Sequence, residues 1–235
     1  MPAGYSFRPR AWAFAAAAAA CAAGIALGHW QAGRADEKRA LGARLEQAFK
    51  APPLEIPDAK IDPRDYVMKH VAARGRFADE HTVYLDNKLR HGRPGYEVVT
   101  PLRLDGVYVL VNRGWVEAGR TRAVLPRVPA PAGEVRIEGL GLAHLAHALE
   151  IGPAPTGKVR QNVDLDAFEQ ETGLRLQPVV IEQHSPAADG LTRDWPRPDA
   201  GIEKHESYAL QWYSLAALSL LLFFFLNLKI GKRKP

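Results

Sequence analysis

Residues 208–228 read YALQWYSLAALSLLLFFFLNL, an uncharged stretch rich in leucine and phenylalanine. A second uncharged stretch, AWAFAAAAAACAAGIALG, covers residues 11–28. At about 1.5 Å rise per residue, each can cross the ~30 Å hydrocarbon core of a bilayer as a helix. The sequence therefore predicts two membrane spans, one near each end, with a folded domain between them.

The first span has an alternative interpretation as a cleaved signal peptide. Arg8 and Arg10 precede the apolar run, and residues 18–21, AAAC, resemble a lipoprotein cleavage box. The apolar run nevertheless continues to Trp30, whereas a mature lipoprotein would begin with a polar linker. An aromatic residue at this boundary is typical of an interface anchor, which favours a retained span.

Basic residues predict the orientation, because short flanks rich in lysine and arginine stay on the cytoplasmic side. The basic residues before the first span and after the second are Arg8, Arg10, Lys229, Lys232, Arg233 and Lys234, and no acidic residue accompanies them. Both ends are therefore predicted to be cytoplasmic. Without these six, the 31 basic residues nearly balance the 26 acidic ones, so the domain gives no support for nucleic-acid binding.

The segment between the spans predicts a fold of class α+β, mainly antiparallel β with short helices. Apolar runs predict strands at residues 67–77, 81–86, 96–104, 107–116, 134–142 and 176–183. Asp105-Gly106 predicts a tight hairpin with positive φ angles. Asp166 and Gly173 predict the start and the stop of a short helix, and a Gly/Pro loop is expected at 152–157.

The predicted organisation has five parts. They are a cytoplasmic N-terminus (1–10), transmembrane helix 1 (11–30), a periplasmic α+β domain (31–204), transmembrane helix 2 (205–228) and a basic cytoplasmic tail (229–235). Helix 1 is expected to continue or restart outside the membrane until Pro52-Pro53, with folded structure from near Tyr66. Cys21, the single cysteine, lies in the first span, so no disulfide is expected in the domain.

His205 is the main candidate ligand. At 100° per residue it shares one helix face with Tyr208 and Trp212, at the mouth of the second span. An imidazole there can coordinate a haem iron, or it can anchor the helix in the interface together with the two aromatic rings. His29, beside Trp30, lies at the matching depth of the first span and is the candidate opposite ligand. The serines lie in no nucleophile-elbow context, and no Gly-rich phosphate loop is present.

Four motifs, in order along the chain, resemble the surfeit-locus (Shy-type) cytochrome c oxidase assembly protein family. They are LGHWQ at 27–31, GRPGYEVVTP at 92–101, VLVNRGWV at 109–116, and the terminal pair LTRDWPRP at 191–198 with EKHESYALQW at 203–212. The motif residues singled out as partner-binding or structural are Trp30, Gln31, Gly95, Tyr96, Asn112, Arg113, Gly114 and Trp115. Arg160 departs from the family, which often has an aromatic residue there.

The resemblance implies a non-enzymatic role in maturing subunit I of the oxidase, together with other assembly factors, in a bacterial inner membrane. It also implies that haem a is held or delivered near His205, the histidine of the last motif. An alternative is a cofactor-free membrane module that stabilises an assembly intermediate. A haem-modifying enzyme is a third hypothesis, for which the sequence offers no acid, base or redox group.

Overall fold

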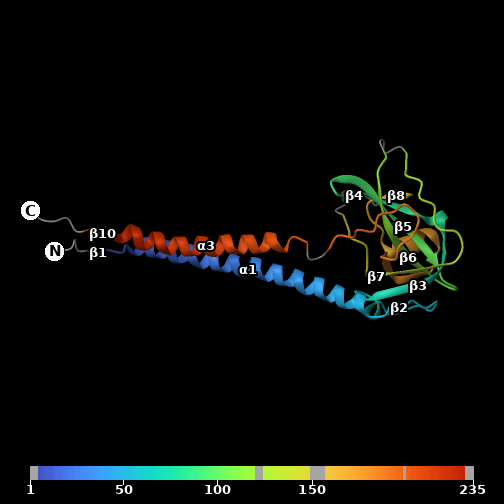
Figure 1. Ribbon diagram of the computed structural model, residues 1–235, viewed down its shortest axis with the longest axis horizontal. Helices are drawn as coiled ribbons and strands as arrows, with labels where there is room; N and C mark the ends of the chain where they lie inside the picture. Colours follow the sequence, from blue (N-terminus) through green and yellow to red (C-terminus); the bar gives the residue numbers. More distant parts are fainter. Residues whose placement is uncertain (1–4, 120–123, 149–156, 198–199, 231–235) are drawn as a thin grey trace, which may run out of the picture. The chain divides into compact units, whose positions relative to one another are not determined.

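The computed structural model describes residues 5–119, 124–148, 157–197 and 200–230 of the 235-residue chain (Figure 1). The chain forms two compact units. Met1–Arg44 and Pro196–Pro235 make up the first, called here the helical unit, and Leu45–Trp195 make up the second, called the sheet unit.

The helical unit consists of two long helices, α1 (Ala11–Lys50) and α3 (Ile202–Asn227). Both are long and apolar enough to cross a membrane. Helix α1 is continuous through its polar second half and ends before Pro52-Pro53. Of the two predicted possibilities, helix 1 therefore continues and does not restart. The last turn of α1 belongs to the sheet unit, where Phe49 packs on the rings of His70 and His184.

The two helices run side by side in opposite directions (Figure 1). The Ser219 hydroxyl lies 3.4 Å from the carbonyl oxygen of Ala17, and the first turn of α3 reaches the middle of α1. Strands β1 (Tyr5–Phe7) and β10 (Leu228–Ile230) pair antiparallel, next to the start of α1 and the end of α3. Residues 231–235 of the predicted basic tail lie outside the described part of the chain.

The sheet unit contains eight strands and three short helices. The strands are β2 (Leu54–Glu55), β3 (His70–Phe77), β4 (Val83–Arg90), β5 (Arg93–Arg103), β6 (Tyr108–Glu117), β7 (Val135–Leu142), β8 (Val159–Arg160) and β9 (Leu176–Gln183). The helices are η1 (Pro63–Asp65), η2 (Asp79–His81) and α2 (Leu165–Thr172). Their sheet order is β2-β3-β7-β9-β6-β5-β4-β8.

A second pairing of β3 closes this sheet into a barrel-like ring. Phe77 pairs with Leu102 of β5, while the rest of β3 pairs with β7. Strands β3, β7, β9, β6 and β5 therefore form a closed five-stranded circuit, antiparallel except for β6 beside β9. Closure leaves these five strands without a free edge, which protects a β domain from edge-to-edge association.

Side-chain alternation divides the apolar residues between the inside and the outside of the ring. Val109, Val111 and Ile181 pack in one buried cluster, whereas Leu110, between the two valines, packs with Phe168 of α2 in another. This period of two is the one a strand imposes, and it lets β6 serve two cores at once. Helix α2 covers the second of these cores.

All six predicted strands are present, and mainly antiparallel pairing of an α+β fold is confirmed. The hairpin at Asp105-Gly106 also forms, with the Leu104 amide donating to the Val107 carbonyl at 2.9 Å, but neither turn residue has the expected positive φ. Folded structure begins before Tyr66, because β2 pairs with β3 and Ile56 is buried in the core. Residues 152–156 of the expected Gly/Pro loop lie outside the described ranges.

The predicted start of α2 is wrong by two residues. The Asp164 carboxylate, not that of Asp166, accepts the N–H of Ala167 and caps the helix at 2.9 Å. Asp164 has the extended backbone that an N-cap requires, whereas Asp166 lies inside the first turn. The predicted stop is confirmed, since Gly173 ends the helix in the left-handed conformation at φ 71°.

Candidate functional site

The candidate site lies in the helical unit, where the first turn of α3 meets α1. Gly201 starts α3 with a left-handed backbone conformation, φ 79°, and His205 follows one turn later. The half-buried imidazole places Nδ1 2.7 Å from Oε1 of Gln31. The structure thus joins the main candidate ligand to a residue of the first motif, 174 positions earlier in the chain.

This contact determines which imidazole nitrogen is left for a ligand. The Gln31 oxygen can only accept, so the pair forms a hydrogen bond when the His205 Nδ1 carries the proton. The Nε2 lone pair then remains available to a metal. Among the described residues, no partner occupies Nε2. A hydrogen bond on the far nitrogen is the usual way in which proteins orient a metal-binding histidine.

Two further contacts fix the same region. Arg39 of α1 forms an ion pair with Glu206, the residue after His205. Lys38 donates from Nζ to the carbonyl oxygen of Ala200 at 2.7 Å, just before α3 begins. Each of these side chains is exposed, so the individual interactions are weak. Together with the Gln31 contact they set the rotation of α3 against α1.

The second candidate histidine has a different partner. His29 Nδ1 lies 3.1 Å from the Tyr213 hydroxyl, and the two rings meet edge to face. Of the other ligand candidates, Tyr208 is exposed and Trp212 is half-buried. In the described part of the chain no contact joins His29 to His205, so the structure brings each imidazole to the opposite helix rather than to the other imidazole. Trp30 is 59% exposed, as an interface anchor requires.

Two glycines of α1 form the close contact between the helices, and our interpretation of the sequence missed them. A Cβ on Gly24 would lie 2.9 Å from Cβ of Ala216, and one on Gly28 would lie 2.4 Å from the ring of Tyr213. Both glycines are buried. Their spacing, GIALG at 24–28, is the GxxxG pattern that lets membrane helices approach closely, and this signal was available in the sequence.

The motif residues of the sheet unit form buried ion pairs. The fully buried Arg113 lies 3.2 Å from the Asp189 carboxylate, which also binds Arg193 at 2.6 Å. Arg113 also donates to the carbonyl oxygen of Pro129 at 3.1 Å and lies over the ring of Phe77. Burial lowers the pKa of Arg113, and Asp189 opposes that effect. Arg113 therefore fixes the loop that leads to the last motifs.

The motif glycines accommodate neighbouring backbone and rings. Gly114 has φ 145°, and a Cβ there would lie 2.8 Å from the carbonyl oxygen of Thr192. A Cβ on Gly95 would lie 2.3 Å from the ring of Trp115. Trp115 in turn donates from Nε1 to the carbonyl oxygen of Lys88 at 2.8 Å. The close approach at Gly114, with the backbone pairing of Trp115 and Thr192, positions the loop at 191–195 on the sheet, whereas the contacts of Gly95 and of the Trp115 ring lie within the sheet.

The remaining motif residues, Tyr96 and Asn112, are also buried. Tyr96 packs edge to face on Tyr84, and Asn112 donates to the Glu97 carboxylate at 3.1 Å. The same carboxylate binds Arg90 at 2.8 Å. The motif side chains of the sheet unit therefore contact other parts of the same unit. These internal contacts explain the residue types without invoking a partner protein.

Arg160, the departure from the family pattern, ties β8 to α2. Its guanidinium makes two bonds to the Glu171 carboxylate, at 2.9 and 3.0 Å, and lies over the Phe168 ring. The hydrogen bond from Arg160 lowers the pKa of Glu171. At this position a planar guanidinium therefore lies above an aromatic ring and pairs with a carboxylate.

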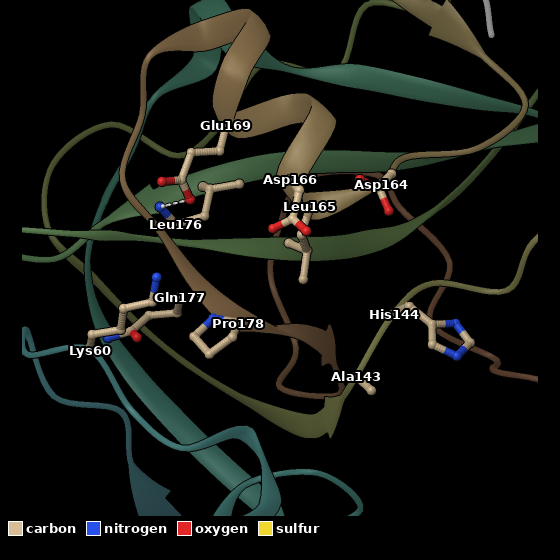
Figure 2. A pocket seen from close by; sticks show the side chains of 10 residues that line it. All are labelled: Lys60, Ala143, His144, Asp164, Leu165, Asp166, Glu169, Leu176, Gln177 and Pro178. Carbon is tan, nitrogen blue, oxygen red and sulfur yellow. Dashed lines mark hydrogen bonds between the residues drawn. The ribbon is translucent and has the colours of Figure 1, made fainter. Parts of the chain in front are cut away.

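A polar hollow of about 230 Å³ lies beside α2 (Figure 2). Three carboxylates line it, but Asp164 caps the helix, and Glu169 accepts the N–H of Leu176 at 3.1 Å, as the dashed line in Figure 2 shows. His144 also lines the hollow. Within the described ranges no group of three metal-ligating side chains occurs. The hollow is thus explained by local capping.

Comparison with known proteins places most of the chain in one family. The SURF1 family model matches residues 18–217. A SURF1-like protein of Monosiga brevicollis is 26% identical over 224 residues, covering 88% of this chain and 84% of the relative. Surfeit locus protein 1 of Mus musculus is 28% identical over 222 residues, covering 86% and 72%, and that of Homo sapiens is 26% identical over 224 residues, covering 84% and 72%. The resemblance based on the four motifs is therefore confirmed, and the chain belongs to the SURF1 family of cytochrome oxidase assembly factors.

Proposed function

We propose that this chain crosses a bacterial inner membrane twice and helps subunit I of cytochrome c oxidase to mature by holding or delivering haem a at His205. The single observation that carries the haem proposal is the 2.7 Å contact between His205 Nδ1 and Gln31 Oε1. Family membership supports the assembly role, and it makes the oxidase and its other assembly factors the expected partners.

Three features support the proposed membrane topology. Helices α1 and α3 are each long and apolar enough to span a bilayer. Arg8 and Arg10 precede α1 with no acidic neighbour, which favours a cytoplasmic location for that end. The pairing of β1 with β10 joins the segment before α1 to the segment after α3, which favours one side of the membrane for both. The sheet unit is then periplasmic, and His205 lies at the periplasmic mouth of α3.

The residues at this mouth fit a haem ligand set. Haem a would supply an iron that a neutral imidazole can bind. His205 would hold that iron through Nε2, while Gln31 keeps the proton on Nδ1 and fixes the ring. Trp212 and Tyr208 follow His205 along α3 and offer aromatic surface to an apolar macrocycle. The exposed pair of Arg39 and Glu206 adds a weak contact beside the one between Gln31 and His205.

We further propose that the chain acts by binding and not by catalysing a reaction. The burial of Arg113 and the other motif residues of the sheet unit favours a second candidate, a cofactor-free module that stabilises an oxidase assembly intermediate. The two candidates share the partner and differ in haem. If the chain binds haem, His205 is needed for haem binding. If the chain is a cofactor-free module, His205 serves only the packing of α3 on α1.

Purification from cells that make haem a separates these candidates. The full chain in mild detergent is expected to show a Soret band that is lost in His205→Ala. His184→Ala, in the sheet unit, is the matched control and is expected to keep the band. A protein that carries no haem under haem-replete conditions would sink the haem proposal and leave the scaffold.

A further inference from the structure

A cavity in the helical unit lies at the opposite ends of the helices from His205. It has a volume of about 620 Å³ and opens between the start of α1 and the end of α3. Ala13, Ala17 and Leu222 make its wall apolar, whereas Arg8 and Arg10 stand at its rim together with Trp12. Trp12 is 69% exposed. An apolar wall below a basic and aromatic rim matches the order of a bilayer, from acyl chain to headgroup.

The two arginines are held in place by the end of α3. The backbone N–H of Arg8 donates to the carbonyl oxygen of Asn227 at 3.0 Å, and the N–H of Arg10 lies 3.3 Å from Asn227 Oδ1. Asn227 is 7% exposed and also donates from Nδ2 to the Phe223 carbonyl oxygen at 2.7 Å. A buried amide at the end of an apolar helix thus fixes the segment that carries both cations.

Within residues 5–119, 124–148, 157–197 and 200–230, no carboxylate pairs with the two arginines. Residues 1–35 and 207–235 contain no aspartate or glutamate, so the nearest acidic residue to Arg10 along α1 is Asp36, about 40 Å away in a straight helix. In the described part of the chain neither guanidinium has a carboxylate partner. Two exposed arginines beside an apolar cavity, without an aspartate or glutamate nearby in the sequence, can take an anion from outside.

We propose that this cavity binds one anionic phospholipid of the cytoplasmic leaflet. Its phosphate would lie between Arg8 and Arg10, where guanidinium groups bind phosphate oxygens in a bidentate way. An acyl chain would fill the apolar wall. Basic pockets between membrane helices are known to select acidic headgroups. A choline lipid carries its own cation beside the phosphate and is expected to bind less well. The proposal rests on the membrane orientation proposed above but not on haem.

Native mass spectrometry of the full chain in detergent tests this proposal. Phosphatidylglycerol and phosphatidylcholine with the same acyl chains are titrated separately. We expect phosphatidylglycerol to bind about 10- to 30-fold more tightly, the ratio that two interfacial arginines supply. Arg8→Gln/Arg10→Gln is expected to abolish the preference. Ala16→Phe, which fills the cavity without changing charge, is expected to weaken the binding of both lipids.

A matched variant separates the cavity from general charge attraction. Lys232→Gln/Lys234→Gln removes two charges from the C-terminal tail and is expected to keep the preference. Equal binding of the two lipids, an intact preference in the arginine variant, or an equal loss in both double variants would each overturn the proposal. A Soret spectrum of the same preparations reports on haem independently, so failure of one proposal is distinguishable from failure of the other.

Discussion

Gln31 and His205, on different helices of the helical unit, lie 2.7 Å apart through Oε1 and Nδ1. The glutamine comes from the motif that follows the first apolar stretch, and the histidine comes from the motif that precedes the second. One polar contact therefore links two family motifs that the sequence presents as unrelated. It also places a polar contact between α1 and α3 at the first turn of α3.

The first prediction concerns Gln31. Gln31→Leu removes the acceptor of the His205 Nδ1 proton, and we expect haem affinity to fall by about 10- to 100-fold, as for other partners of metal-binding histidines. Gln31→Glu keeps an acceptor at the same place and is expected to retain binding. Haem titration followed in the Soret region measures both. Equal affinity of Gln31→Leu and the unchanged chain would contradict a positioning role.

The second prediction concerns the close approach of the helices. Gly28→Leu places a side chain where the Tyr213 ring lies, and overpacking of this kind costs about 1–3 kcal/mol. Gly33→Leu is the matched control, because nothing lies within 4 Å of a Cβ at that position. In a Cys21→Ser background, oxidative cross-linking of cysteines introduced at Ala17 and Ser219 reports on the helix pair. Cross-linking should drop in Gly28→Leu alone, and an unchanged yield would argue against this packing.

The third prediction concerns the buried ion pairs of the sheet unit. Asp189→Asn removes the carboxylate that pairs with the buried Arg113 and Arg193 guanidinium groups, and we expect a loss of about 3–5 kcal/mol in the free energy of unfolding. Glu117→Gln breaks only an exposed pair with Arg93 and should cost less than about 1 kcal/mol. Denaturant unfolding of the sheet unit in the full chain, followed by far-UV circular dichroism, compares the two. Similar losses of unfolding free energy in the two variants would show that burial of the Arg113, Asp189 and Arg193 side chains is unimportant.

The fourth prediction concerns pH. Arg160 lowers the folded-state pKa of Glu171, so the carboxylate adds stability at pH values above its unfolded pKa of about 4.3. That contribution disappears as the pH falls through the lower folded pKa. The stability difference between the unchanged chain and Glu171→Gln should therefore be constant from neutral pH to about pH 5 and shrink below about pH 4.3. A difference independent of pH over this range would be inconsistent with the ion pair.

Local signals in the sequence predicted local structure well. The Asp105-Gly106 hairpin and the stop of α2 at Gly173 depend on neighbouring residues, and both formed. The start of α2 was misplaced because Asp164 and Asp166 are both plausible caps, and only the backbone conformation of Asp164 distinguishes them. Residue types therefore predict that a helix or strand is present more reliably than they predict the residues at which it begins and ends.

Long-range relationships could not be predicted in the same way. The pairing of Phe77 with Leu102 closes the ring, but no local pattern in β3 or β5 specifies it. His205 was chosen by its position at the mouth of α3, and Gln31 by its motif, yet nothing in a single sequence states that they touch. The Gly24 and Gly28 pair is different, since its spacing was readable and only its partner surface, Ala216 and Tyr213, needed the structure.

The haem a content of membranes is the most direct measure of whether this chain has an assembly role in the oxidase. Reduced-minus-oxidised spectra are recorded for cells that lack this chain and for cells complemented with it or with His205→Ala. We predict that the haem a signal of the assembled oxidase falls without the chain, returns with the unchanged chain and returns only in part with His205→Ala. An unchanged haem a signal in cells that lack the chain would contradict the assembly role itself.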